Sequence, residues 1–213
     1  IRSVRFGPAR DGVPRTLVTA STDGTAILWD LTLNGDEISL SRKHVFEHRD
    51  GSAQTPEPAQ ESQRQIRYAE ISPDGRIVAT AGQDMSVRLW STESGRMIGQ
   101  PLQHKGMVQH LRFHFGPEVQ QLVSTSYDGT AIVWRAASRS DNGARDQASA
   151  GSAPHVDAEL AIPRVLNHGS AVLWAEFAPD GGYVVTAGTD GMARVWQASD
   201  GAPVGQPARH SDR

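Results

Sequence analysis

The sequence contains no cysteine, and this absence excludes a disulfide framework and thiol chemistry. No apolar run approaches the roughly 20 residues of a membrane-spanning helix, so we expect no membrane partner. Charge of one sign is not in excess, because 21 basic and 24 acidic residues are interspersed and leave a net charge of −3. A nucleic-acid-binding surface needs a basic patch, and we therefore expect no nucleic-acid partner.

An initiator methionine and a signal peptide are also lacking. We expect the true N-terminus to lie outside the sequence and the protein to be cytoplasmic. The 213 residues are enough for a sizeable core. An apolar content of 38%, with 21 glycines and 12 prolines, fits short half-polar strands and many turns better than a packed α/β enzyme.

One short pattern occurs four times, at residues 17–29, 78–90, 122–134 and 184–196. In every copy an aspartate lies six residues before a tryptophan, and a serine or threonine lies four residues before that aspartate. Each copy has the pattern of a β-hairpin, with two apolar runs around a turn that reads Asp-Gly-Thr in the first and third copies. Matches at fixed offsets indicate a fold built from repeated units.

The polar residues of each copy suggest one network. A buried tryptophan needs an acceptor for its indole N–H, and the hydroxyl group across the hairpin is a candidate. A histidine recurs upstream, as His104 and His168, four residues before a valine that opens a new strand. Such buried groups are tolerated only when all of them are hydrogen-bonded.

This combination resembles the WD-repeat (WD40) β-propeller family, whose blades carry a structural His–Ser/Thr–Asp–Trp tetrad. The resemblance covers nearly the whole chain and implies an all-β propeller segment of four blades with four antiparallel strands each, part of a larger ring. Two family features are weak: the aspartate after the tryptophan survives only as Asp30, and no glycine precedes the histidines. His48 follows Glu47, but an insertion separates it from the inner strand of unit two, so the four-residue spacing seen after His104 and His168 is lost. No histidine is therefore assigned to unit two. The tetrad residues that the resemblance implies are Thr19, Asp23, Trp29, Thr80, Asp84, Trp90, His104, Ser124, Asp128, Trp134, His168, Thr186, Asp190, Trp196 and His210.

The repeat divides the chain into four units, at about residues 1–47, 48–103, 104–167 and 168–213. The innermost strands match one another at 1–6, 66–71, 108–113 and 172–177, with apolar residues at the first, fourth and sixth positions. The step from first to fourth breaks alternation and predicts a bulge. Two insertions, 49–64 and 136–157, are small, polar and aperiodic, and we expect mobile loops that act as spacers rather than binding arms.

Hydroxyl, histidine and aspartate together also suggest a hydrolase. The set recurs in several units, whereas a catalytic site needs one, and no G-x-S-x-G motif is present. His110 and His114 would lie about 13 Å apart along a strand, too far for one metal ion. We therefore predict no enzyme, no metal and no cofactor.

Partners of WD-repeat proteins usually bind the top face, around the central channel. The resemblance implies that this face carries Arg2, Gln65, Arg67, Gln83, Met85, Met107, Gln109, Tyr127 and Leu173. Methionine, leucine, tyrosine and arginine are residue types that anchor interfaces. Trp174 lies outside the tetrads, and we expect it to pack between blades rather than to line the top of the inner strand.

The resemblance implies a non-enzymatic protein–protein interaction scaffold or docking module within a larger signalling or regulatory protein. The alternative is a ligand-binding or enzymatic propeller with a site in the central channel. Gly-Gln-Pro outer strands and Pro-Asp-Gly turns resemble bacterial WD-repeat arrays. Because Ile1 aligns with Val108, the chain reads as four whole repeats, and we expect further blades from the parent chain or from a second copy. In the second case His210 would complete the tetrad of unit one.

Overall fold

The computed structural model describes residues 1–10, 12–35, 37–48, 64–115, 120–136 and 160–210. The insertions expected at 49–64 and 136–157 therefore lie almost wholly outside the described residues. Within the described part, all regular elements are strands apart from short turns, and no helix is long and apolar enough to cross a membrane.

The strands form four antiparallel four-stranded sheets, which we call blades one to four, and a small ribbon of two strands. The expected all-β architecture is confirmed. Consecutive strands pair within each blade, as the hairpin pattern predicts. The strands are β1 (Ser3–Phe6), β4 (Thr16–Ala20), β5 (Thr25–Asn34) and β6 (Glu37–Glu47) in blade one; β7 (Ile66–Ile71), β8 (Ile77–Gly82), β9 (Ser86–Ser91) and β10 (Met97–Gln103) in blade two; β11 (Val108–Phe115), β12 (Gln120–Ser126), β13 (Thr130–Ala136) and β14 (Leu160–Asn167) in blade three; β15 (Val172–Phe177), β16 (Tyr183–Gly188), β17 (Met192–Gln197) and β18 (Pro203–Arg209) in blade four; and β2 (Ala9–Arg10) with β3 (Val13–Pro14) in the ribbon.

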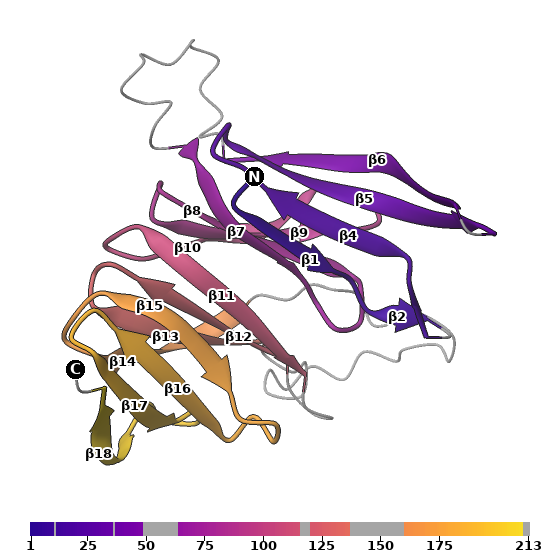
Figure 1. The fold of residues 1–213 in the computed structure, drawn as a ribbon. Coiled ribbons are helices and arrows are strands. Elements are labelled where there is room, and N and C mark those ends of the chain that lie inside the picture. Colours follow the sequence, from indigo (N-terminus) through magenta and orange to yellow (C-terminus); the bar gives the residue numbers. More distant parts are fainter. Residues whose placement is uncertain (11, 36, 49–63, 116–119, 137–159, 211–213) are drawn as a thin grey trace, which may run out of the picture.

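The blades pack face to face, and their first strands β1, β7, β11 and β15 lie next to one another (Figure 1). We call the surface formed by these four strands the inner wall. The predicted bulge is present in three of them: pairing with the second strand slips between Ile66 and Tyr68 in β7, and at the matching places in β11 and β15. The slip breaks alternation, so the first, fourth and sixth residues can all reach the core.

Three apolar cores hold the blades together, one at each junction between neighbours. Each core joins the second, third and fourth strands of one blade to the first strand and the tetrad tryptophan of the next. Large members are Leu28, Phe46, Ile66 and Ile71 at the first junction, Leu89, Leu111, Leu122 and Trp134 at the second, and Val133, Leu166, Val184 and Trp196 at the third. Burial of each such side chain stabilises the fold by about 1.5 to 3 kcal/mol.

The outer flanks of the first and last blades are open. Val185 of blade four is 40% exposed, whereas Val123 at the matching position of blade three is fully buried. On the other flank, Val4 of blade one is 53% exposed, whereas Ala69 at the matching position of blade two is fully buried. The open flank of blade four therefore matches the surface that blade three turns to its neighbour, and the open flank of blade one matches the surface that blade two turns to blade one.

Candidate functional site

The tetrad of blade three is a closed hydrogen-bond network. The His104 ring lies between Ser124 and Asp128, with Nε2 2.7 Å from Ser124 Oγ and Nδ1 3.3 Å from Asp128 Oδ2. The Trp134 indole N–H donates to the same Ser124 Oγ at 2.8 Å. Nδ1 faces a carboxylate and so carries the proton, which leaves Nε2 to accept from the Ser124 hydroxyl group. Asp128 also accepts from the backbone N–H of Lys105 at 2.8 Å, which fixes the next loop.

Blade two has a complete tetrad as well, and its histidine is His48. Its Nε2 lies 2.7 Å from Thr80 Oγ1, its Nδ1 lies 3.0 Å from Asp84 Oδ1, and Trp90 donates to Thr80 Oγ1 at 2.8 Å. The spacing rule that finds His104 and His168 does not find His48, because the insertion separates it from β7. The signal that identifies it is its place directly after an outer strand, since His104 and His168 follow β10 and β14 in the same way.

Blade four closes its network with the two ring nitrogens exchanged. His168 Nδ1 lies 2.8 Å from Thr186 Oγ1, and Nε2 lies 3.2 Å from Asp190 Oδ1. Trp196 donates to Thr186 Oγ1 at 2.8 Å. Arg194 adds a donor to Asp190 at 2.8 Å. Arg88 does the same for Asp84 in blade two, and both arginines lie four residues after the aspartate, a spacing that the repeat pattern did not single out.

Blade one has the same hairpin without a histidine. Trp29 donates to Thr19 Oγ1 at 3.0 Å, and Asp23 accepts only from Thr25 and the adjoining turn among the described residues. Trp29 is half-buried, unlike the other three tetrad tryptophans. His210, which the resemblance assigns to a tetrad, is exposed, and its backbone N–H donates to Gly191 as that of His104 donates to Met85.

Burial sets the charge state of the tetrads. It lowers the pKa of His48, His104 and His168, and it outweighs the neighbouring carboxylates that favour the imidazolium form. Burial also pushes the pKa of Asp84 and Asp128 upward, but hydrogen bonds to each carboxylate outweigh it and hold the pKa below the usual value. The tetrads therefore hold neutral imidazole beside carboxylate.

The tetrad aspartates lie in the turns between the second and third strands, at one edge of the blades. This edge is the one predicted as the top face. Backbone hydrogen bonds link its loops in series: Gln83 donates to Gln65 at 2.9 Å, His104 to Met85 at 2.9 Å, and Tyr127 to Met107 at 3.0 Å. All nine predicted binding residues are at least partly accessible. Arg2, Met85, Tyr127 and Leu173 are exposed, and Gln65, Arg67, Gln83, Met107 and Gln109 are half-buried.

The inner wall carries an aromatic row, one residue from each of blades two to four. The His110 ring stacks on Trp174 at 3.7 Å between centroids and meets the edge of Tyr68 at 4.6 Å. The Arg5 guanidinium lies 5.1 Å from the centre of the Tyr68 ring. The prediction that Trp174 packs between blades holds for one face only. The side chain remains 46% exposed, because it lies on the inner wall beside the open flank.

A second row of alternating charges lies two residues further along the same strands. Arg112 bridges Glu70 and Glu176, with a distance of 2.8 Å to each. Burial raises the pKa of Glu70 to about 7, against the opposing charge of Arg112. Burial, together with the positive charges of Arg5 and Arg112, lowers the pKa of His110 to about 3. The signal for this row was the fifth position of the aligned inner strands, which reads Arg, Glu, Arg, Glu.

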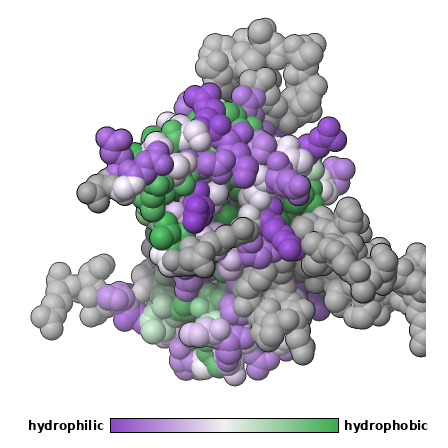
Figure 2. Space-filling model, turned by 90° about the vertical axis from the view of Figure 1, so that its right-hand side faces the viewer, coloured by the Kyte–Doolittle hydropathy of each residue, from purple (hydrophilic) through white to green (hydrophobic). Residues whose placement is uncertain are grey.

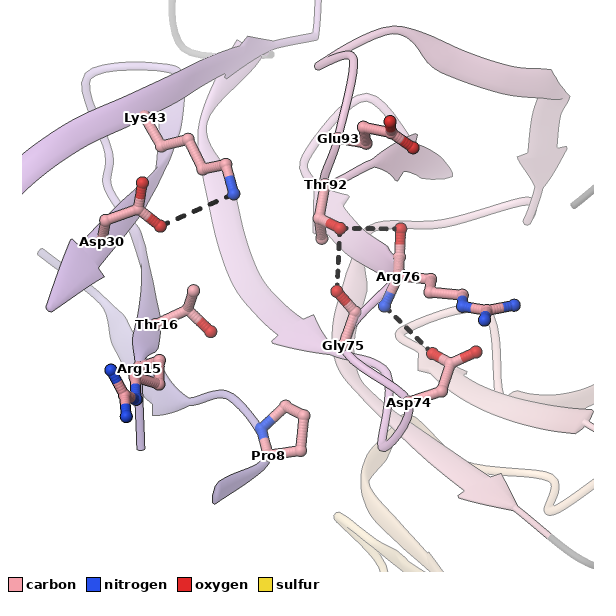
Figure 3. Close-up of a pocket in the computed structure, with 10 residues that line it drawn as sticks. All are labelled: Pro8, Arg15, Thr16, Asp30, Lys43, Asp74, Gly75, Arg76, Thr92 and Glu93. Carbon is pink, nitrogen blue, oxygen red and sulfur yellow. Dashed lines mark hydrogen bonds and ion pairs between the residues drawn. The ribbon is translucent and has the colours of Figure 1, made fainter. Parts of the chain in front are cut away.

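The edge opposite the top face, which carries β2 and β3, is largely hydrophilic over its described residues (Figure 2). A cleft of about 540 Å³ opens there between blades one and two. On one wall, Lys43 Nζ lies 3.6 Å from Asp30 Oδ1 (Figure 3). On the other wall, the Thr92 hydroxyl group donates to the carbonyl oxygen of Gly75 at 2.8 Å. The Arg76 and Glu93 side chains point away from Lys43, so the charges of the cleft do not converge.

The tetrad hydroxyl groups of blades two to four are engaged within their own networks. Each tetrad hydroxyl is occupied by a tryptophan N–H, and in blades two to four a histidine holds it on the other side. A nucleophile needs an open approach for its substrate. Within the described residues, no group of three His, Asp or Glu side chains is placed to hold a metal ion.

Comparison with known proteins agrees with this structure. The chain is similar to the U3 snoRNP-associated protein-like EMB2271 of Arabidopsis thaliana, with 31% identity over 57% of the chain and 25% of that protein. It is similar to the F-box-like/WD repeat-containing protein TBL1X of Mus musculus, with 30% identity over 56% of the chain and 21% of that protein. Ribosome assembly protein 4 of Chaetomium thermophilum is 34% identical over 40% of the chain and 13% of that protein.

The chain thus spans a quarter or less of the length of these relatives. The family model described as "WD domain, G-beta repeat" (WD40) matches residues 59–91, 97–135 and 162–197, just over half of the chain. These segments contain the tetrad tryptophans of blades two, three and four. The chain belongs to the WD40 repeat family.

Proposed function

We propose that the chain is a non-enzymatic protein-interaction scaffold that binds partner proteins or peptides through its top face. The observation that carries this proposal is that buried, hydrogen-bonded polar groups and exposed apolar side chains lie next to each other in the blades. The tetrads of blades two to four turn their polar groups inward and satisfy them, whereas the adjoining turns present Met85 and Tyr127 to solvent and the start of β15 presents Leu173. Exposed apolar side chains on a hydrogen-bonded framework are typical of binding surfaces.

The relatives support a role within a larger assembly. The names of two of them refer to ribosome assembly and to association with U3 snoRNP, and a third contains WD repeats beside an F-box-like segment. We extend only the general role to this chain, as a docking module of a larger signalling or regulatory protein in the cytoplasm. Its likeness to bacterial arrays rests on the Gly-Gln-Pro strands and Pro-Asp-Gly turns alone, since the three relatives named above come from eukaryotes.

The proposal includes further blades on the two open flanks, from the parent chain or from a second copy. Val4 and Val185 are exposed at positions that neighbouring blades cover elsewhere. In this proposal His210, which is exposed directly after β18, joins the tetrad of an adjoining blade. Sedimentation of the purified chain tests this part: self-association that Val185→Glu abolishes supports it, and a monomer at every concentration, unchanged by the substitution, contradicts it.

The alternative, an enzymatic or ligand-binding site in the central channel, has less support. The charges of the inner wall are engaged with one another, as Arg112 is with Glu70 and Glu176, and do not converge on open space.

Partner capture with matched variants tests the interaction proposal. Tyr127→Ala and Arg67→Glu are expected to abolish capture by the full-length protein while the thermal midpoint stays nearly unchanged. Tyr183→Ala removes a tyrosine of similar exposure away from the top face and should leave capture intact. Equal loss with all three variants, or no loss with any, would count against a top-face scaffold.

A further inference from the structure

Met85 has a backbone conformation that its sister residues leave to glycine. The residue after the tetrad aspartate is Gly24, Gly129 or Gly191 in blades one, three and four, with φ angles of 85°, 87° and 72°. In blade two this residue is Met85, with φ of 64°, the one non-glycine residue of positive φ in the described part of the chain. A Cβ atom is disfavoured in this left-handed region, so the methionine destabilises its turn relative to glycine.

Packing does not account for this residue. The Met85 side chain is 43% exposed and is absent from the three apolar cores. A strained residue that is retained where glycine serves the fold in three sister turns points to a use for its side chain.

Backbone hydrogen bonds link the Met85 turn in series to loops that carry other exposed groups. Its carbonyl accepts the His104 N–H at 2.9 Å, and the loop that begins at His104 reaches Met107, whose carbonyl accepts the Tyr127 N–H at 3.0 Å. Tyr127 is 47% exposed, and Lys105 lies exposed on the connecting loop. The nearest tetrad carboxylates, Asp84 and Asp128, are turned inward to their histidines. The solvent-facing charge of this loop is therefore positive.

We propose that Met85, Lys105, Met107 and Tyr127 form a docking patch for an acidic peptide segment that carries a large apolar side chain. The inference rests on the proposed top-face function and specifies its partner. The two thioethers and the phenol ring contact the apolar side chain, since methionine adapts its shape to a bound group. The Lys105 ammonium attracts the flanking carboxylates, and this attraction weakens as salt is added.

Three fluorescent peptides test the proposal by anisotropy with the full chain. One has Leu and Phe flanked by Asp and Glu, one has the same pair flanked by Lys and Arg, and one has Ser and Gly flanked by Asp and Glu. We expect the first to bind at least about tenfold more tightly than the other two. Met85→Gly should weaken its binding about tenfold or more, while the thermal midpoint stays equal or rises because glycine relieves the turn. Met97→Ala, at a methionine of 42% exposure on outer strand β10, is the matched control and should leave binding unchanged.

Equal binding of the first peptide by the parent and Met85→Gly would overturn the proposal, and so would a fall in the thermal midpoint of that variant. Preference for the basic peptide, lost with Tyr127→Ala, would overturn the acidic partner and leave the top-face function standing. Loss of all peptide binding together with partner capture that no top-face variant affects would overturn both.

Discussion

Blades one and three each carry a hydroxyl residue, an aspartate and a tryptophan at the same spacing. Among the described residues, only blade three also has the tetrad histidine. In blade three Ser124 bonds to Trp134 on one side and to His104 on the other, and Trp134 is only 6% exposed. In blade one Thr19 bonds to Trp29 alone at a longer 3.0 Å, and Trp29 is half-buried. The hydroxyl group is thus the centre of the tetrad, and the histidine connects it to the aspartate turn. A blade can form without this connection. Its tryptophan is less protected, and among the described residues it also lacks the preceding blade that covers the tryptophan at each of the three junctions.

The largest difference between the two blades is expected on removal of the tryptophan. Trp134→Ala leaves a large cavity and removes the indole donor to Ser124, and it should lower the free energy of unfolding by about 3 to 5 kcal/mol. Trp29→Ala removes a half-buried ring and should lower it by about 2 kcal/mol. Urea unfolding followed by circular dichroism measures both. A Trp134 variant as stable as the parent would contradict the tetrad assignment.

Removal of the hydroxyl group should also destabilise the two blades by different amounts. Ser124→Ala leaves both His104 and Trp134 without their shared partner, and we expect a loss of about 2 to 3 kcal/mol. Thr19→Ala strands only Trp29, which is also nearer to solvent, and should lose about 1 kcal/mol. Equal losses in urea unfolding would mean that the histidine adds nothing to the network.

Acid should lower the free energy of unfolding, because a buried histidine takes up a proton more readily in the unfolded chain than in the native one. His110 has a folded-state pKa of about 3 against 6.5 unfolded, so below pH 6.5 the unfolded chain takes up a proton that the native chain does not. Its contribution to stability is complete above pH 6.5 and falls by about 2 kcal/mol by pH 5. His110→Phe should reduce the acid loss by that amount, whereas His210→Phe, at an exposed position, should not. The pH dependence of the urea midpoint decides between them, and an unchanged acid slope in His110→Phe would show that this ring is not buried as neutral imidazole.

An effect of opposite sign is expected from Glu70. Its pKa is raised from 4.5 to about 7, so the native carboxyl group keeps its proton while the unfolded one has lost it. Its contribution to stability is present below pH 4.5 and is lost as the pH rises through 7. Glu70→Gln should therefore gain stability relative to the parent as the pH rises above 4.5, by about 1 kcal/mol at pH 5 and about 3 kcal/mol at pH 7. Thermal midpoints at several pH values measure this, and a gap that narrows with rising pH would contradict the assignment.

The sequence was sufficient to predict whatever recurs in register. Hairpins, the bulge of the inner strands and the four-stranded sheets follow from fixed offsets and apolar periodicity, because these are local. It was insufficient where contact depends on neighbouring blades. His48 is separated from its own blade by an insertion, and the Glu70–Arg112–Glu176 row joins three different repeats. The strain at Met85 depends on a φ angle, and its only trace in the sequence is a methionine where three sister turns have glycine.

Hydrogen exchange of the four tetrad indole N–H groups, resolved by nitrogen-15 NMR, tests most directly the claim that the histidine-linked hydroxyl protects each blade. We expect the indole N–H of Trp29 to exchange first, and those of Trp90, Trp134 and Trp196 to exchange much more slowly and at similar rates. Exchange of Trp29 as slowly as Trp134, in a blade whose described residues supply no tetrad histidine, would contradict this claim.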